Sequence, residues 1–259
     1  KKLVTPFILR RNKKEVLTEL PDKIEQNIIL PFNDEEEKLY VANLAEANKE
    51  LQELYDLEGS DKMQILKLLT RLRQLCLEPR LVYDDIDQPS SKLKACMELI
   101  KTMQENKQKV LLFSSFTSVL DLIAEECQKA GITYYMLTGS TNKEDRRELV
   151  SRFQKDDTTV FLISLKAGGT GLNLTSAEAV IHFDPWWNVS AQNQATDRAY
   201  RIGQKNNVQV FNLVMKDSVE EKIIELQKRK KELADMFVEN NSGGLSQMSK
   251  EDILSLFTV

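Results

Sequence analysis

Short apolar runs that alternate with segments of helical length constrain the fold of this sequence more than any other feature. Each run is too short for a helix and is bounded by glycine, serine or polar residues. Strands that alternate with helices in this way form βαβ units, in which the strands run parallel and the helices cover both faces of the sheet. We therefore predict an α/β fold with strands over 110–113, 132–137, 159–163, 179–183 and 208–214, and helices over 92–105, 117–130, 142–155, 190–202 and 218–239.

Two of these helices have clear start signals in the sequence. Thr141 with Glu144 has the spacing of a capping box, in which the hydroxyl and the carboxylate satisfy free amides at the start of a helix. Ser218 with Glu221 has the same spacing before the last long helix.

The first ninety residues read as helical and are strongly uneven in charge. Residues 34–57 and 61–77 have apolar residues at helical spacing, Asp61 can cap the second helix, and the polar stretch 84–91 resembles a linker. Acidic residues are concentrated in 34–58, whereas all the charged residues of 1–14 are basic. Because the charge is so unevenly distributed, the net charge of −4 neither supports nor excludes nucleic-acid binding. The acidic helices would also suit a protein-interaction scaffold.

Composition argues against several classes of protein. Hydrophobic residues make up 41% of the chain, enough for a sizeable core, yet no apolar run approaches the roughly 20 residues of a membrane span. No signal-peptide pattern opens the chain. Three dispersed cysteines and one histidine indicate reduced, packed thiols and no zinc site. We expect an intracellular protein with no membrane partner.

Small and hydroxyl-bearing residues follow three consecutive predicted strands. The segments concerned are 114–117, 138–141 and 164–173, the last of which contains four glycine or hydroxyl residues in a row, 168–171. Parallel strands end at one edge of a sheet, and small residues there expose backbone amides that suit phosphate oxygens. Ordinary turn chemistry is the alternative for any single loop. The chain has no GxxxxGK[ST] element, so this glycine loop is not a Walker A motif.

A helix predicted over 190–202 would place two arginines on one face with an amide and a carboxylate. The spacing is i, i+3, i+4 and i+7 for Gln194, Asp197, Arg198 and Arg201. A planar guanidinium neutralises the charge that develops on a transferring phosphoryl group. The same face would equally suit a solvated surface, and the spacing alone does not separate the two interpretations.

The two tryptophans of the chain, Trp186 and Trp187, follow a predicted strand between Pro185 and Asn188. Large aromatic residues in a loop pack on a partner or stack on nucleic acid, although a core role is the alternative. His182 lies inside the strand, where a packed, hydrogen-bonded histidine is the more common arrangement than a catalytic one.

The order of these motifs resembles the carboxyl-terminal helicase lobe of the Swi/Snf family in helicase superfamily two. Residues 109–117 look like motif four, 164–173 like motif five and 194–204 like motif six, with 183–188 close to the aromatic signature of the family. Residues 6–21 are similar to the connector between the two lobes, and 218–239 to the brace helix. Val189 departs from the proline that commonly follows Asn188. The resemblance implies a RecA-like lobe and the segments 1–33 (connector), 34–90 (helical extension), 91–215 (RecA-like lobe) and 216–259 (brace and C-terminal helices).

The resemblance also implies a role for each matching residue. Arg198 and Arg201 would be arginine fingers organised by Gln194 and Asp197, and Gly169 and Gly171 would lie near the nucleotide. The residues expected along DNA phosphates are Ser114, Thr138, Gly139, Ser140 and Lys166, whereas Trp186 and Trp187 would couple the lobes or touch DNA. The cofactor would be ATP with Mg²⁺, whose ligands would lie on a first, Walker-bearing lobe outside this chain.

These expectations describe half of an ATP-driven translocase on double-stranded DNA that is inactive without the first lobe of its parent chain. A strand-separating helicase and a non-catalytic nucleic-acid-binding module are the alternatives. The sequence leaves open whether the translocase moves RNA polymerase, a nucleosome or another DNA-bound protein. A cytoplasmic, nucleoid-associated bacterial location is favoured over a nuclear one, because long low-complexity tails and basic clusters are lacking.

Overall fold

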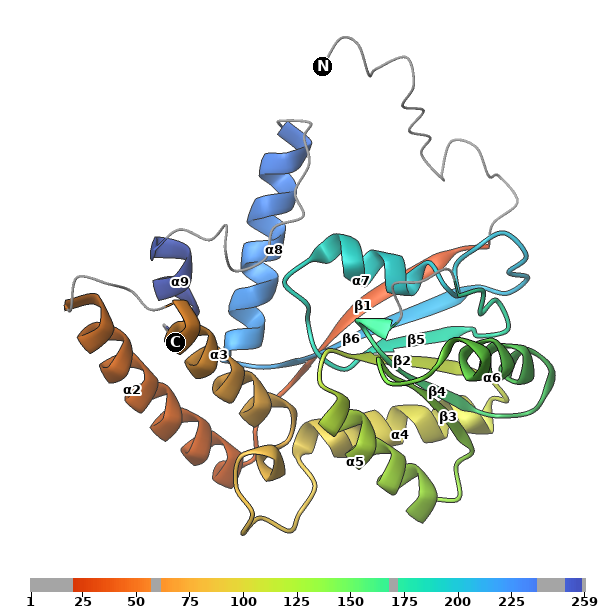
Figure 1. Ribbon diagram of the computed structural model, residues 1–259, viewed down its shortest axis with the longest axis horizontal. Helices are drawn as coiled ribbons and strands as arrows, with labels where there is room; N and C mark the ends of the chain where they lie inside the picture. The colour runs from red at the N-terminus through yellow and green to blue at the C-terminus, as the bar shows by residue number, and fades with distance from the viewer. Residues whose placement is uncertain (1–20, 57–61, 168–171, 237–249, 258–259) are drawn as a thin grey trace.

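The protein is a six-stranded, all-parallel sheet with helices on both faces and a helical extension at one side (Figure 1). The computed structural model describes residues 21–56, 62–167, 172–236 and 250–257. The sheet order is β1-β6-β5-β2-β4-β3. The strands are β1 (Lys23–Leu30), β2 (Val110–Ser114), β3 (Tyr134–Leu137), β4 (Val160–Ser164), β5 (Ala179–His182) and β6 (Val208–Met215). The predicted fold class and all five predicted strands are confirmed.

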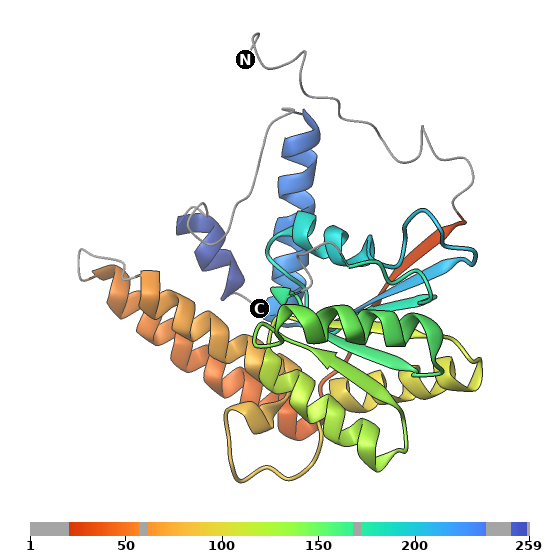
Figure 2. The same cartoon turned by 45° about the vertical axis from the view of Figure 1, so that its right-hand side comes forward.

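Two helices cover each face of the sheet. α4 (Ser91–Glu105) and α5 (Thr117–Lys129) pack on one face, and α6 (Lys143–Lys155) and α7 (Val189–Thr196) lie over the other (Figure 2). Successive side chains of a strand point to opposite faces, so Leu112 joins the first core and Leu111 and Phe113 join the second. Burial on both faces is the reason that the central strands are continuous apolar runs.

The edge strand β1 corrects the expectation that the first ninety residues are helical. It pairs in parallel with β6, with Ile28 opposite Leu213, and therefore belongs to the sheet. Most of its side chains are exposed, including Ile24 and Ile29, because helices cover this edge only in part. A strand with so little burial lacks the apolar run or strict alternation by which strands are recognised in a sequence.

Helices are present in the segments predicted as the helical extension and the brace helix, and they share one core. α2 (Asp34–Asp56) and α3 (Lys62–Leu77) form an antiparallel pair beside the sheet, followed by the short η2 (Pro79–Leu81) (Figure 1). α8 (Val219–Met236) and α9 (Lys250–Leu256) close this core with Ile223, Leu226 and Leu256. The expected cap Asp61 lies outside the described residues.

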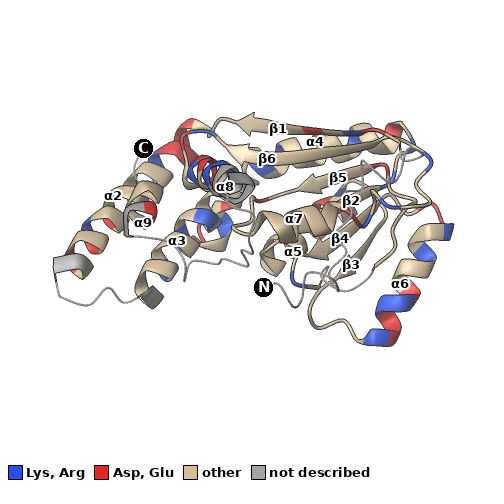
Figure 3. Cartoon of the chain, turned by 90° about the horizontal axis from the view of Figure 1, so that it is seen from above, with Lys and Arg blue, Asp and Glu red and all other residues tan. Residues whose placement is uncertain are grey.

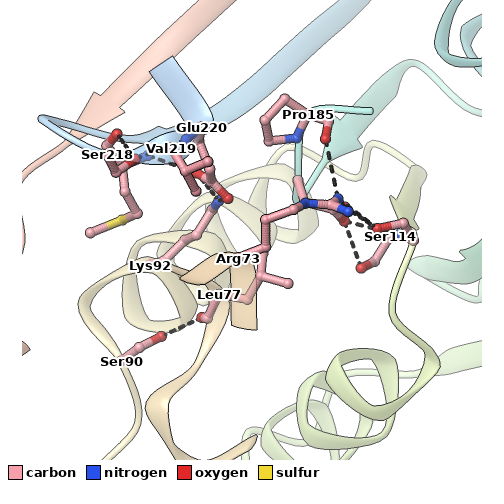
Figure 4. Close-up of polar contacts among 12 residues, drawn as sticks. Arg73, Leu77, Ser90, Lys92, Ser114, Pro185, Ser218, Val219 and Glu220 are labelled. Atoms are coloured by element: carbon pink, nitrogen blue, oxygen red, sulfur yellow. Dashed lines mark hydrogen bonds and ion pairs between the residues drawn. The ribbon is translucent and has the colours of Figure 1, made fainter. Parts of the chain in front are cut away.

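A buried ion pair ties α8 to the sheet side of the molecule (Figure 4). Lys92 Nζ lies 2.6 Å from Glu220 Oε1 and 2.7 Å from Oε2, and Glu220 also accepts the Met215 amide at 2.9 Å. Both side chains are essentially inaccessible to solvent. Lys92 is the second residue of α4 and Glu220 the second of α8, so the pair fixes the start of one helix against the start of the other.

The capping box predicted at Thr141 is wrong. Asn142 caps α6, because its side chain accepts hydrogen bonds from the amides of Glu144 and Asp145. The hydroxyl of Thr141 instead accepts the Thr138 amide at 3.1 Å and shapes the preceding loop. At α8, the Ser218 hydroxyl does accept the Glu220 amide, as a capping residue should.

Candidate functional site

Four neighbouring strands, β5, β2, β4 and β3, end side by side, and the sequence motifs follow these carboxyl ends. We call this side of the sheet, formed by the carboxyl ends of the strands, the edge. The backbone holds these ends together beyond the sheet itself. The Leu165 amide donates to the Ser114 carbonyl at 2.9 Å, and the Phe183 amide donates to the Phe113 carbonyl at 2.9 Å. The three small-residue loops predicted to share one edge therefore follow adjacent strands.

The loop after β3 carries hydroxyl groups and a glycine, and it lies largely at the surface. Thr138 Oγ1 and Ser140 Oγ lie 2.8 Å apart, and Gly139 and Ser140 are exposed. A Cβ atom added at Gly139 would meet no neighbour within 4 Å, and its φ angle is not positive. Neither packing nor backbone conformation therefore requires glycine here, and the exposed backbone has open space around it.

The loop after β4 is described only in part. Lys166 is exposed, and the buried Ser164 accepts the Ala167 amide at 3.3 Å. Arg146 from α6 donates to the Ala167 carbonyl at 3.1 Å and anchors the loop to that helix. Basic and acidic residues alternate along α6, so this helix does not present a field of one sign (Figure 3). The predicted nucleotide-side residues Gly169 and Gly171 lie outside the described residues.

The loop after β2 differs from the prediction at Ser114. This side chain is fully buried, and its hydroxyl donates to Asp184 Oδ1 at 2.7 Å, so it faces the protein interior and not the edge. The next residue, Ser115, is half-buried and donates its amide to the same carboxylate oxygen at 2.9 Å. The structure thus does not support Ser114 as a direct phosphate contact, because Asp184 occupies its hydroxyl.

The two tryptophans are half-buried and pack around an arginine from the helical extension. The Arg73 guanidinium lies over the Trp186 ring at 5.7 Å and over the Trp187 ring at 5.6 Å from their centroids. It also forms an ion pair with Asp184 at 2.7 Å. Sequence reasoning missed Arg73, since it lies 111 residues from Asp184 and no local pattern marks it.

The predicted helical face of Gln194, Asp197, Arg198 and Arg201 does not form as a continuous helix. α7 ends at Thr196, and tight turns lead from there to Gly203, whose φ angle is +104°. The buried Gln204 fixes these turns by donating to the Ala177 carbonyl at 2.8 Å and accepting the amides of Lys205 and Asn206. Gln194 and Arg201 are exposed, whereas Arg198 is buried.

Arg198 is a buried cation with free donors. Its side chain is only 7% exposed, and within the described ranges neither Nε nor Nη2 has a hydrogen-bond partner. Burial, and then the neighbouring Arg201, lower the pKa of Arg198 from its usual range. A buried charge without its full complement of partners is costly and uncommon in a folded protein. The arrangement fits an anion such as a phosphate group, which would supply the missing acceptors.

His182 is a packed histidine, as predicted. It stacks on Phe113 with ring centroids 5.6 Å apart, and its Nε2 lies 2.9 Å from the hydroxyl of Thr196. Burial lowers the pKa of His182 to about 4, so the ring is neutral at physiological pH. Its hydrogen bond to the last residue of α7 joins β5 to the segment that carries Arg198.

Comparison with known proteins shows the family to which this chain belongs. The description "Helicase conserved C-terminal domain" matches residues 91–203, and "SNF2-related domain" matches residues 1–81. The chain is a carboxyl-terminal helicase lobe of the Swi/Snf family. This Swi/Snf lobe therefore has the RecA-like architecture that the resemblance implied.

The relatives of this Swi/Snf lobe are much longer than the chain itself. It is 39% identical over 254 residues to an uncharacterized ATP-dependent helicase of Mycoplasma pneumoniae, covering 98% of this chain and 24% of that protein. It is 34% identical to a putative ATP-dependent helicase/translocase of Bacillus subtilis, covering 99% and 28% respectively. The chain thus spans about a quarter of the length of these relatives.

A solved structure with DNA is also similar to the Swi/Snf lobe. The Sulfolobus solfataricus SWI2/SNF2 ATPase core in complex with double-stranded DNA superposes with a TM-score of 0.74 at 32% identity, covering 99% of this chain and 55% of that one. Within the described part of the chain, no helix is long and apolar enough to cross a membrane, and no three His, Cys, Asp or Glu side chains cluster as a metal site.

Proposed function

We propose that this chain is the second motor lobe of an ATP-dependent translocase on double-stranded DNA. In this proposal, Arg198 and Arg201 act on the phosphates of an ATP molecule that is held mainly by a first lobe. The observation that carries the proposal is the buried Arg198 guanidinium, whose Nε and Nη2 donors have no acceptor among the described residues. A site that maintains free cationic donors is prepared for an anion that arrives from outside.

The two arginines would have different tasks. Arg198 is buried in the segment between α7 and β6, and its carbonyl accepts the Leu174 amide at 3.0 Å. It would grip phosphate oxygens with little reorganisation. Arg201 is exposed and would reach the nucleotide when the first lobe closes over the edge. Gln194 and Asp197 would orient the arginines, and Gly169 and Gly171 would border the nucleotide.

Mg²⁺ bound with ATP would neutralise part of the phosphate charge, with its protein ligands on the first lobe. The residues of this chain would supply positive charge and hydrogen-bond donors only. Because the sequence contains no Walker A element, we expect no ATP turnover from the isolated chain.

DNA would lie along the exposed part of the same edge. Thr138, Gly139, Ser140 and Lys166 would contact the phosphates of one strand, and Trp186 and Trp187 would contact DNA or the first lobe. The DNA-bound relative supports DNA binding at the level of the family. Further partners would be the first lobe of the same parent chain and a DNA-bound protein such as RNA polymerase or a nucleosome.

Replacement of Arg198 by methionine tests the proposal through two measurements with different expected signs. In the full-length protein that carries this lobe, DNA-stimulated ATP hydrolysis should fall by about 10³–10⁵ while DNA binding persists. In the isolated chain, the midpoint of urea unfolding should stay the same or rise, since a poorly compensated buried cation has been removed.

The matched control is Arg152→Met, because Arg152 is an exposed arginine of α6 that pairs with Glu148. This variant should hydrolyse ATP like the wild type. If Arg198→Met instead hydrolyses ATP normally and lowers the unfolding midpoint, Arg198 is a structural residue, and a non-catalytic nucleic-acid-binding module becomes the better description.

A further inference from the structure

Arg73 is the residue at which three distant parts of the chain meet. It lies on α3 in the helical extension, and its side chain is 8% exposed. Its Nη2 contacts Asp184 Oδ2 at 2.7 Å, Ser115 Oγ at 2.9 Å and the Pro185 carbonyl at 3.4 Å (Figure 4). One guanidinium therefore touches both the loop after β2 and the loop after β5.

Aromatic rings surround the same guanidinium. Its central carbon lies 4.9 Å from the Phe116 ring centroid, in addition to the contacts with Trp186 and Trp187. A planar, delocalised cation can stack on rings with its faces while it donates hydrogen bonds from its edge, and the compact ammonium of lysine cannot do both. The site therefore selects for arginine and not only for positive charge.

Asp184 is the counterpart of Arg73 in the two loops. Its side chain is fully buried and accepts hydrogen bonds from the Ser114 hydroxyl, the Ser115 amide and the Ser115 hydroxyl. A buried carboxylate with a cation and several donors is well satisfied, but it becomes costly when the cation is removed. Arg73 and Asp184 thus hold the two loops in one arrangement.

The aromatic segment has separate supports for its backbone. The Trp186 amide donates to Gln192 of α7 at 3.2 Å, and Gln227 of α8 donates to the Trp186 carbonyl. Those contacts hold the main chain, whereas the positions of the two rings depend on neighbouring side chains. Arg73 is a neighbour that contacts both the Trp186 and the Trp187 ring. Both tryptophan residues are half-buried and pack against core clusters, so each keeps only part of its surface accessible.

We propose that Arg73 is a positioning residue of the motor, through which the helical extension fixes Trp186 and Trp187 for contact with DNA or the first lobe. This inference rests on the proposed function of the edge as a DNA and inter-lobe surface. It assigns the extension a direct part in that surface, although α3 lies outside the sheet.

Tryptophan fluorescence of the chain tests the positioning without any assumption about function, because Trp186 and Trp187 are its two tryptophans. Arg73→Met should shift the emission maximum to longer wavelength and increase quenching by acrylamide, and Arg73→Lys should lie between it and the wild type. Arg71→Met is the matched control. Arg71 is two residues away and also lies over an aromatic ring, that of Tyr83, but it bonds to Asn43 and not to the edge loops. Its emission should equal that of the wild type.

The full-length protein tests the functional part. DNA-stimulated ATP turnover should fall by about 10- to 100-fold in Arg73→Met, the range expected when groups are displaced by about an ångström. Turnover should remain unchanged in Arg71→Met. If the wild-type protein itself shows no DNA-stimulated turnover, the proposed function fails, whereas the fluorescence result still decides whether Arg73 positions the tryptophans.

A double variant separates positioning from charge compensation and remains informative if Arg73→Met folds poorly. Arg73→Met with Asp184→Asn removes both charges, so the unfolding midpoint should return towards the wild type. We expect the altered emission and the reduced turnover to persist in the double variant. Wild-type emission in Arg73→Met, or recovery of turnover to within twofold of the wild type in the double variant, would overturn the proposal.

Discussion

Replacement of Lys92 by methionine isolates the buried ion pair that joins α4 to α8. Methionine preserves most of the apolar part of the lysine side chain, so little packing is lost. The charged end of that side chain, Nζ, lies 5.3 Å from the Phe183 ring centroid. The change leaves Glu220 fully buried with the Met215 amide as its remaining close donor. The variant therefore measures the charge interaction rather than a cavity.

The size of the effect follows from burial. Lys92 and Glu220 are 0% and 1% exposed and contact each other at 2.6 Å, so solvent cannot replace the lost partner. Breaking such a pair by removing one charge costs about 3–5 kcal/mol in the free energy of unfolding. For a domain of this size, each kcal/mol moves the Tm by roughly 2–4 °C, so the Tm should fall by about 6–20 °C.

The pH dependence supplies a second, independent check. Burial raises the pKa of Glu220, and Lys92 opposes that rise. Without Lys92 the folded-state pKa of Glu220 rises further above its unfolded value, so the folded variant binds a proton that the unfolded chain does not. The stability of the variant must then increase as pH falls from this higher pKa towards the unfolded value, and its deficit relative to the wild type should shrink.

The assay is urea unfolding of the isolated chain, followed by circular dichroism at 222 nm, for both proteins at pH 7.5 and pH 5.5. A double variant, Lys92→Met with Glu220→Gln, should recover most of the lost stability, because the glutamine carbonyl can still accept the Met215 amide. A deficit below about 1 kcal/mol at pH 7.5, or one that is equal at both pH values, would refute the reasoning.

Two further predictions concern His182 and Lys166. Burial lowers the pKa of His182 to about 4 from 6.5, so its stabilising contribution is present above pH 6.5 and is lost as pH falls towards 4. His182→Phe should therefore gain about 2–3 kcal/mol relative to the wild type between pH 7.5 and 4.5 in urea unfolding, and a constant difference would contradict the neutral, buried ring. Lys166→Gln should weaken DNA binding of the full-length protein and reduce the slope of log affinity against log salt by about one. Lys129→Gln, on an exposed lysine of α5 that pairs with Glu126, is its control, and equal slopes in the two variants would remove Lys166 from the DNA surface.

Local patterns in the sequence predicted the parts of the fold whose burial is repeated along the chain. The runs around Leu112, Leu162 and Ile181 are continuous apolar segments, because both faces of a parallel sheet are covered by helices. α2 and α3 show the 3.6-residue period of helices that bury one side. β1 escaped detection, since an edge strand with mostly exposed side chains has neither signal.

The sequence indicated which residue types gather at the candidate site, but not how their side chains are arranged. Hydroxyl, glycine and arginine residues after consecutive strands indicated a phosphate-binding edge, and parallel topology brings those loops together. The sequence could not show that α7 ends at Thr196, because the turn depends on Gln204 reaching the Ala177 carbonyl on another segment. It likewise could not show that Asp184 occupies the Ser114 hydroxyl.

The sequence by itself determined the order of the strands and helices that follow β1, the Swi/Snf resemblance and the chemical types gathered at the edge. Tertiary structure alone decided which of those side chains remain free for a ligand and which are used internally. Among the described residues, Arg198 retains donors without a partner, whereas Ser114 does not, although both belong to recognisable motifs. The physical reason is that hydrogen-bond partners such as Arg73 and Asp184 come from segments more than a hundred residues apart, and residue spacing carries no information about such pairs.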